Sequence, residues 1–174
     1  MTDVPLTGAV TIVVAEGRRM MRLARELEPG VFDALLEEYH RHLRQLLESM
    51  GGREVDFDSD TGMAAFPTAK QAALAAVAAQ RAVAGHEWPH GRQLAMSVGL
   101  DSGTAGESWD GPAVARCSEL CDAAEGGQIF VTQAVSSALE EDDLGELVLR
   151  DLGEVPLRRS DRKVRAHELV MPAK

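Results

Sequence analysis

Apolar side chains recur along the chain at spacings that change from segment to segment, and these spacings predict the order of its elements. Residues 9–15, AVTIVVA, form a continuous apolar run typical of a central strand buried on both faces. Residues 31–50 carry large apolar side chains at helical spacing, namely Leu35, Tyr39, Leu43, Leu46 and Met50. The pattern predicts a buried strand and, further on, a long amphipathic helix that Gly51-Gly52 ends.

A tight hairpin is predicted directly after this helix. Its strands are residues 54–58 and 63–66, and the polar residues 59–62, SDTG, supply the turn chemistry. Asp60 is therefore expected at the hairpin tip, with Asp56 and Asp58 behind it on one face of the first strand. This acidic group either binds a cation or is solvated, and a polar turn is the simpler interpretation of the segment alone.

The second half of the chain alternates helices and strands. Helices are expected at residues 68–85, 113–124 and 133–139. Strands are expected at residues 94–100, 128–132, 146–151 and 164–171. In residues 94–100, LAMSVGL, large side chains alternate with small ones, so one face of this strand is nearly bare and leaves room for something to approach. The order of elements predicts one α+β domain with helices packed on a sheet.

Composition narrows the class of protein. With 174 residues the chain is long enough for one domain with a proper core. The formal net charge of -10 argues against a nucleic-acid partner, because phosphate backbones are bound by clustered Lys and Arg. The sequence shows no apolar run of about 18 residues and no signal peptide, so we expect a cytoplasmic domain with no membrane partner.

The cysteines and histidines give no strong site. Cys117 and Cys121 lie four apart on one helical face, and we interpret them as packing thiols because a pair does not fill a zinc site. His40 and His42 lie two apart on a helix and cannot face one another. They are interpreted, with His86 and His90, as surface or loop histidines.

Several segments match the motifs of one protein family, in order and at the right spacing. Residues 10–23, VTIVVAEGRRMMRL, align without a gap with the pattern V-T-F-L-F-T-D-I-E-G-S-T-R-L. The hairpin resembles G-G-R-x-x-K-x-x-G-D-G-x-x-A-A-F, and residues 98–103, VGLDSG, resemble V-G-L-H-T-G. Residues 111–120, GPAVARCSEL, resemble G-P-A-V-N-R-A-A-R-L, and residues 126–129 and 151–154 match the remaining signatures. Over about residues 7–170 the chain therefore resembles the class III adenylate/guanylate cyclase catalytic domain.

The resemblance implies a ferredoxin-like sandwich with a central, mostly antiparallel sheet. It also implies a homodimer, or a heterodimer with another cyclase-like domain, because the family's active sites lie at the interface of a head-to-tail dimer. The family's two metal-binding carboxylates fall on Glu16, which is one methylene longer than the usual Asp, and on Asp60. Both would supply oxygen ligands for Mg²⁺ or Mn²⁺, although Mg²⁺ tolerates a displaced carboxylate poorly.

Other family positions have lost their chemistry. The base-recognising positions fall on Asp56 and Ser108, and the Asn and Arg used around the ribose and the transition state fall on Ala115 and Glu119. Each lost donor is normally worth about 10² to 10³ in rate, and Glu119 places a negative charge where negative charge must develop. A triphosphate would therefore meet an acidic pocket.

Arginines stand at the first two positions of the family's E-G-S-T segment, whose backbone amides approach the phosphates. Arg18 and Arg19 stand at these positions, and Arg158 lies near one that often holds a phosphate-binding Lys. They either bind a different anion or pair with nearby acids and solvent.

Three hypotheses follow from the sequence. The first is a catalytically silent domain that associates with proteins or senses a nucleotide or other small ligand. The second is a weak Mn²⁺-dependent nucleotidyl cyclase, and the third is the metal-supplying half of a heterodimeric cyclase.

Overall fold

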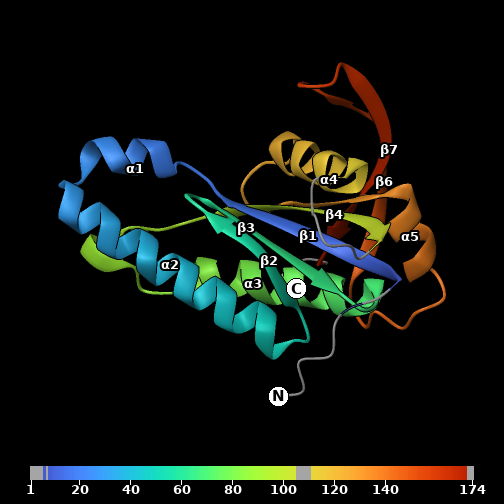
Figure 1. Ribbon diagram of the computed structural model, residues 1–174, viewed down its shortest axis with the longest axis horizontal. Helices are drawn as coiled ribbons and strands as arrows, with labels where there is room; N and C mark the ends of the chain where they lie inside the picture. Colours follow the sequence, from blue (N-terminus) through green and yellow to red (C-terminus); the bar gives the residue numbers. More distant parts are fainter. Residues whose placement is uncertain (1–5, 7, 105–110, 172–174) are drawn as a thin grey trace.

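The strands form a single sheet (Figure 1). The apolar run of residues 9–15 forms a strand near the middle of this sheet. Their bounds are β1 Ala9–Gly17, β2 Arg53–Asp58, β3 Thr61–Phe66, β4 Met96–Thr104, β5 Ile129–Thr132, β6 Val148–Leu157 and β7 Arg162–Val170. The sheet order is β2-β3-β1-β4-β5-β7-β6. In this computed structural model, which describes residues 6, 8–104 and 111–171, β4 and β5 are the only parallel neighbours, so the predicted mostly antiparallel sheet is confirmed.

Helices cover both faces of the sheet. Their bounds are α1 Met20–Glu26, α2 Pro29–Ser49, α3 Ala69–Gly85, α4 Pro112–Ala123 and α5 Gln133–Leu139, with a 3₁₀ turn η1 at Pro89–Gly91. In Figure 1, α2 and α3 lie on one side of β1 and α4 lies on the other. Side chains alternate across β1 accordingly: Val13 belongs to the core cluster of α2 and α3, and Ile12 belongs to that of α4. The predicted α+β sandwich is confirmed.

The long helix α2 buries a slightly different stripe from the one expected. Leu35, Tyr39 and Leu43 are fully buried, as predicted, but the next core position is Leu47 rather than Leu46. A straight helix turns once in about 3.6 residues. Leu47, four residues after Leu43, therefore lies as close to the buried face as Leu46, three residues after it. This helix also begins earlier than predicted, with Pro29 in its first turn, where proline is tolerated.

The bare face of β4 is filled by α4. A Cβ on Gly99 would lie 2.5 Å from the carbonyl oxygen of Cys117 and 2.8 Å from the backbone nitrogen of Cys121, so only glycine allows this approach. The thiol of Cys117 donates a hydrogen bond to the carbonyl of Gly99 at 2.9 Å. Both cysteines are buried and unpaired with one another, which confirms their packing role. β4 itself begins two residues later than predicted and continues to Thr104, because it pairs with β1 over that whole length.

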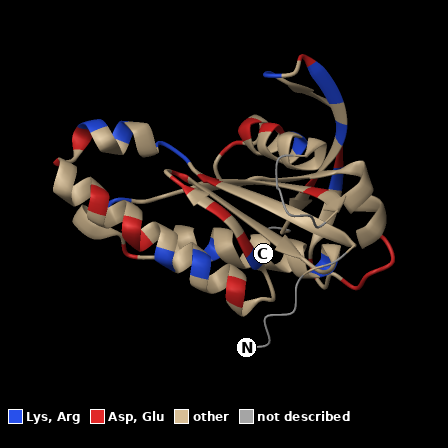
Figure 2. Ribbon diagram, viewed as in Figure 1, with Lys and Arg blue, Asp and Glu red and all other residues tan. Residues whose placement is uncertain are grey.

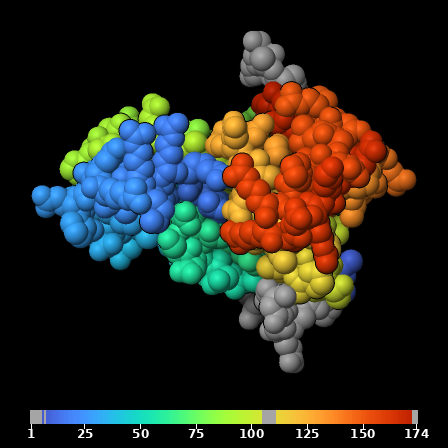
Figure 3. Space-filling view, turned by 90° about the horizontal axis from the view of Figure 1, so that it is seen from above, coloured from blue at the N-terminus to red at the C-terminus, as the bar shows by residue number. Residues whose placement is uncertain are grey.

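The terminal hairpin β6–β7 is longer than predicted and covers part of α4 (Figure 3). At its turn the backbone N–H and the hydroxyl of Ser160 both donate to Oε2 of Glu119 on α4, at 3.1 and 2.8 Å. Several Lys and Arg residues lie along the outer part of this hairpin (Figure 2). The hairpin therefore brings basic residues to the helix that carries two of the family-matched positions.

Candidate functional site at the end of β1

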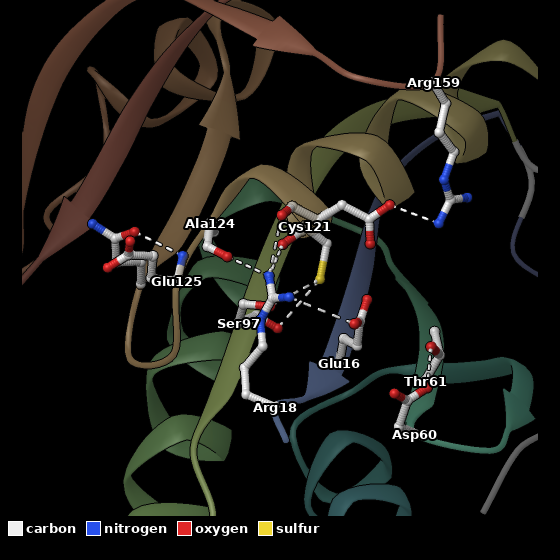
Figure 4. A network of polar contacts seen from close by, with 11 residues as sticks. Glu16, Arg18, Asp60, Thr61, Ser97, Cys121, Ala124, Glu125 and Arg159 are labelled. Carbon is white, nitrogen blue, oxygen red and sulfur yellow. Dashed lines mark hydrogen bonds and ion pairs between the residues drawn. The ribbon is translucent and has the colours of Figure 1, made fainter. Parts of the chain in front are cut away.

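Glu16, at the end of β1, and Asp60, in the turn before the neighbouring strand β3, lie at the same end of the sheet (Figure 4). Glu16 lies one residue before the end of β1 and pairs in register with Thr61, the first residue of β3. Asp60 stands in the hairpin turn, as predicted, and its carbonyl accepts a hydrogen bond from the backbone N–H of Gly17 at 2.8 Å. The side chain of Asp60 accepts from the hydroxyl of Thr61 at 3.3 Å. The fold thus brings the two family-matched carboxylates together.

Glu16 lies in an unusual electrostatic environment. The pKa of its carboxyl group is raised from 4.5 to about 7, chiefly by burial and next by a hydrogen bond with Asp122 and the negative charge of that residue, while Arg18 opposes the shift. Asp122 lies on α4 and also pairs with Arg159 at 2.7 Å. Near neutral pH, Glu16 is therefore partly protonated.

The guanidinium of Arg18 is held beside Glu16 by the end of α4. Its Nη1 lies 3.6 Å from Oε1 of Glu16, and its Nη2 donates to the carbonyls of Cys121, at 2.8 Å, and of Ala124 (Figure 4). The last carbonyls of a helix have no partner within the helix and carry partial negative charge, so a cation is favourable there. Arg18 therefore caps α4 and at the same time neutralises Glu16.

These residues do not fit Mg²⁺ or Mn²⁺ as they are arranged. A divalent ion needs ionised carboxylates, and Glu16 is partly protonated near neutral pH and already has a positive partner. Arg18 has no lone pair to offer a metal, and its positive charge would repel one. Metal binding at Glu16 and Asp60 would require that Arg18 leave the carbonyls of α4.

The positions matching the family's transition-state groups present no donors toward a nucleotide. Ala115 is an exposed methyl group on α4. Glu119, one turn later, accepts two hydrogen bonds from Ser160 and is half-buried. This carboxylate has a structural partner within the chain.

The base-recognising positions are not brought into the same group. Asp56 and Asp58 are both exposed on the edge strand β2. The sequence left open whether these acids bind a cation or are solvated, and their exposure favours solvation. Among the described residues, the acidic hairpin does not gather three ligand atoms within metal-binding reach. Ser108, the other position, lies outside the described residues.

The three arginines expected near an anion line one surface cavity of about 750 Å³. Arg18 forms part of its wall, Arg19 is exposed beside it, and Arg158 reaches it from the turn of β6–β7. Asp122 and Glu125 line the same cavity, so its charge is mixed. The structure therefore brings the three predicted anion-contacting arginines to one cavity, although the guanidinium of Arg18 already donates hydrogen bonds to the last carbonyls of α4.

Sequence reasoning missed two features. One is Asp122, which stands near the C-terminal end of α4 and carries no motif signal. The other is a group of three side chains elsewhere, Glu38, His42 and His86, whose ligand atoms all lie within 4.8 Å of one another. His42 is partly exposed and His86 lies in a loop, as predicted, but their rings lie 4.1 Å apart between centroids, a contact that the sequence did not predict. The four-residue spacing of Glu38 and His42 on one helix was the available signal.

Comparison with known sequences gives distant matches. No protein-family model matches the chain. An uncharacterised protein of Mycobacterium tuberculosis is 26% identical over 176 residues, which cover 99% of this chain and 59% of that protein. An adenylate cyclase of Schizosaccharomyces pombe is 25% identical over 167 residues, which cover 80% of this chain and 10% of that enzyme. The chain thus spans less than two thirds of the length of these relatives.

Comparison with solved structures identifies the fold. Trypanosoma brucei adenylate cyclases in their monomeric state match with a TM-score of 0.84 at 19% identity, covering 97% of this chain and 91% of that one. The catalytic core of a rhodopsin-guanylyl cyclase with converted specificity, in complex with ATPαS, gives 0.83 at 15% identity, covering 95% and 97%. A dimeric guanylyl cyclase domain from Blastocladiella emersonii gives 0.80 at 16% identity, covering 94% and 97%.

This chain therefore has the fold of the class III adenylyl and guanylyl cyclase catalytic domains, as its sequence motifs predicted. No helix among the described residues is both long and apolar enough to cross a membrane.

Proposed function

We propose that this chain is a catalytically silent cyclase-like domain that acts by pairing with a second cyclase-type domain. The observation that carries the proposal is the position of Arg18. Its guanidinium supplies the positive charge beside Glu16 that a metal ion would otherwise supply, and the end of α4 holds it there.

The charges at the other matched positions support the same proposal. A nucleoside triphosphate brings negative charge, and cyclisation requires donors near the groups where more charge develops. Ala115 offers a methyl group and Glu119 a carboxylate. Asp56, at the base-recognising position, is a second acid. The site would therefore repel the substrate rather than stabilise its transition state.

The fold supports pairing as the mode of action. The Blastocladiella emersonii guanylyl cyclase domain that shares this fold has been solved as a non-canonical dimer and also as a monomer, so domains of this fold can pair. We propose that the present chain forms a homodimer or joins a different cyclase-like domain. The cavity that Arg19 and Arg158 line would then face the partner or a small anionic ligand such as a nucleotide.

A second candidate function is favoured by one observation, the position of Glu16 and Asp60 at the same end of the sheet. If Arg18 were displaced, these carboxylates would be placed to hold Mn²⁺ or Mg²⁺. The domain would then be a weak cyclase or the metal-supplying half of a heterodimer.

Cyclic nucleotide formation separates these candidates. Under the proposal, the purified chain with ATP or GTP and Mn²⁺ yields no cyclic product above a blank, and Glu16→Ala and Asp60→Ala variants give the same result. Product that disappears in both variants would establish the weak cyclase instead.

The pairing function is tested by mixing. The chain is added in increasing amounts to an active class III cyclase from the same cell, and activity and sedimentation are followed together. A change in activity that parallels formation of a mixed dimer supports regulation. Sedimentation as a monomer at every concentration, with the added cyclase unaffected, would overturn it.

A further inference from the structure

Three side chains that could ligate a metal meet between α2 and the segment that follows α3. Glu38 and His42 lie one turn apart on α2, and His86 directly follows the last residue of α3. Oε1 of Glu38 is 2.7 Å from Nε2 of His86 and 3.9 Å from Nε2 of His42. The three ligand atoms therefore face a common point.

The group is half-buried rather than solvated. Side-chain exposure is 23% for Glu38, 26% for His86 and 41% for His42. Such exposure leaves an entry path for an ion from solvent. Because the three side chains are also partly buried, water screens their charges less, and their attraction for a metal ion is stronger than at the open surface.

Trp88 gives the group a rigid apolar wall. Its side chain is 3% exposed, and its indole N–H donates to the carbonyl of Val83 at 2.9 Å, which ties residues 86–88 back onto α3. The indole ring lies 4.3 Å from the ring of His86 and 5.9 Å from that of His42, between centroids. His86 is therefore held near α2 by packing as well as by Glu38.

The donor set indicates which ions fit. Two imidazole nitrogens and one carboxylate oxygen suit Zn²⁺ and neighbouring transition metals, whereas Mg²⁺ prefers carboxylates, carbonyls and water. Ligand bonds of about 2.0–2.2 Å in a tetrahedral site place ligand atoms about 3.3–3.6 Å apart. The distances of 2.7 and 3.9 Å lie on either side of this range, so small side-chain rotations would complete the site.

We propose that Glu38, His42 and His86 bind a single divalent transition metal ion of the Zn²⁺ class. The ion links α2 to the end of α3 and keeps a coordination position open for water or another ligand. This site shares no residue with the group at Glu16 and Asp60, so it does not depend on the proposed function.

The direct test measures metal binding by the whole chain, produced without a polyhistidine tag and freed of metal with a chelator. Titration with Zn²⁺ by calorimetry is expected to show one ion per chain, and melting temperature to rise with Zn²⁺ because the ion binds the folded state. Mg²⁺ is expected to leave the heat signal and the melting temperature unchanged. Absence of saturable Zn²⁺ binding would overturn the proposal.

Ligand variants locate the ion. Loss of a group that only supports a ligand costs about 10- to 100-fold in metal affinity, so removal of a ligand in His42→Ala, His86→Ala or Glu38→Gln should cost about 100-fold or more. The matched controls are His90→Asn, at an exposed histidine four residues after His86, and Glu37→Gln, at the exposed acid beside Glu38. Unchanged affinity in the ligand variants, or equal loss in the controls, would place the ion elsewhere.

A spectroscopic measurement covers the case in which a ligand variant fails to fold. Co²⁺ in place of Zn²⁺ should give the visible absorption of a nitrogen and oxygen site without a thiolate charge-transfer band, because both cysteines are buried elsewhere. In a Trp109→Phe chain, where Trp88 is the remaining tryptophan, Co²⁺ should quench fluorescence along the same binding curve. A thiolate band, or Trp88 fluorescence that Co²⁺ does not change, would contradict the assignment.

Discussion

The group at the end of β1 and the group between α2 and α3 both combine carboxylates with nitrogen-bearing side chains. At the end of β1 the nitrogen belongs to Arg18, which is always protonated and cannot ligate a metal. Between α2 and α3 the nitrogens belong to His42 and His86, whose neutral rings carry a lone pair. The first group therefore already has its counter-ion, whereas the second has ligands to offer.

This difference shows that the number of acids is a poor guide to metal binding. Glu16, Asp60 and Asp122 outnumber the single carboxylate of Glu38. Glu16 is nevertheless partly protonated near neutral pH and already lies beside Arg18. A proton and a metal ion compete for the same carboxylate oxygen atoms. What decides whether a carboxylate can ligate is the kind of charge that its neighbours already supply.

The largest expected effect comes from removing the internal counter-ion. Arg18→Ala should lower the free energy of unfolding by about 2–3 kcal/mol, because the carbonyls at the end of α4 lose a charged donor. It should also allow Mg²⁺ to raise the melting temperature, whereas we expect Mg²⁺ to leave the melting temperature of the unmodified chain unchanged. Urea unfolding and thermal shift with and without Mg²⁺ check both points.

The control for this change is Arg19→Asn, because Arg19 is exposed and has a left-handed backbone conformation that asparagine tolerates. If Arg18→Ala were as stable as the unmodified chain, or if it remained insensitive to Mg²⁺, Arg18 would not be acting as a substitute for a metal.

A smaller effect is expected from the raised pKa of Glu16. Because its folded pKa of about 7 lies above its ordinary 4.5, this carboxyl group stabilises the fold fully below pH 4.5, and the contribution is lost as pH rises through 7. Glu16→Gln mimics the protonated form, so the variant should match the unmodified chain at pH 5 and exceed it at pH 8. After allowance for solvent screening, the gain at pH 8 is about 1–2 kcal/mol.

Urea unfolding at a series of pH values in chelator-containing buffer measures this gain. Asp58→Asn, at an exposed acid of the neighbouring hairpin, serves as the control and should show no such gain in stability between pH 5 and pH 8. A Glu16→Gln variant with the same pH profile as the unmodified chain would mean that Glu16 ionises normally and is free to bind a metal.

The smallest effect is expected at Glu119, whose carboxylate accepts hydrogen bonds from the backbone N–H and the hydroxyl of Ser160. Glu119→Ala should lower the free energy of unfolding by about 0.5–1 kcal/mol, since the two hydrogen bonds from Ser160 are lost near the surface. Glu125→Ala, an exposed acid just after α4, is the control and should change stability less. A stability that rises in Glu119→Ala would show that this carboxylate is strained by its position and is not a structural partner of the hairpin.

The periodic parts of the fold were predictable from the sequence. The stripe that begins with Leu35 predicted α2, the apolar run of β1 predicted a strand buried on both faces, and the polar turn predicted Asp60 at a hairpin tip. Each of these depends on which face of one element is buried, and that information is written in the spacing of neighbouring residues. Motif spacing likewise indicated the cyclase fold, which the solved structures share.

The contacts that set the chemistry were decided only by the tertiary structure. Arg18 reaches carbonyls 103 to 106 residues away, and His86 meets Glu38 across 48 residues. Spacing along the chain indicates that a side chain faces outward or inward, but it does not say which distant side chain shares that direction. That pairing depends on how closely the helices pack, as at Gly99, where the absence of a side chain lets α4 lie against β4 and present its last carbonyls to Arg18.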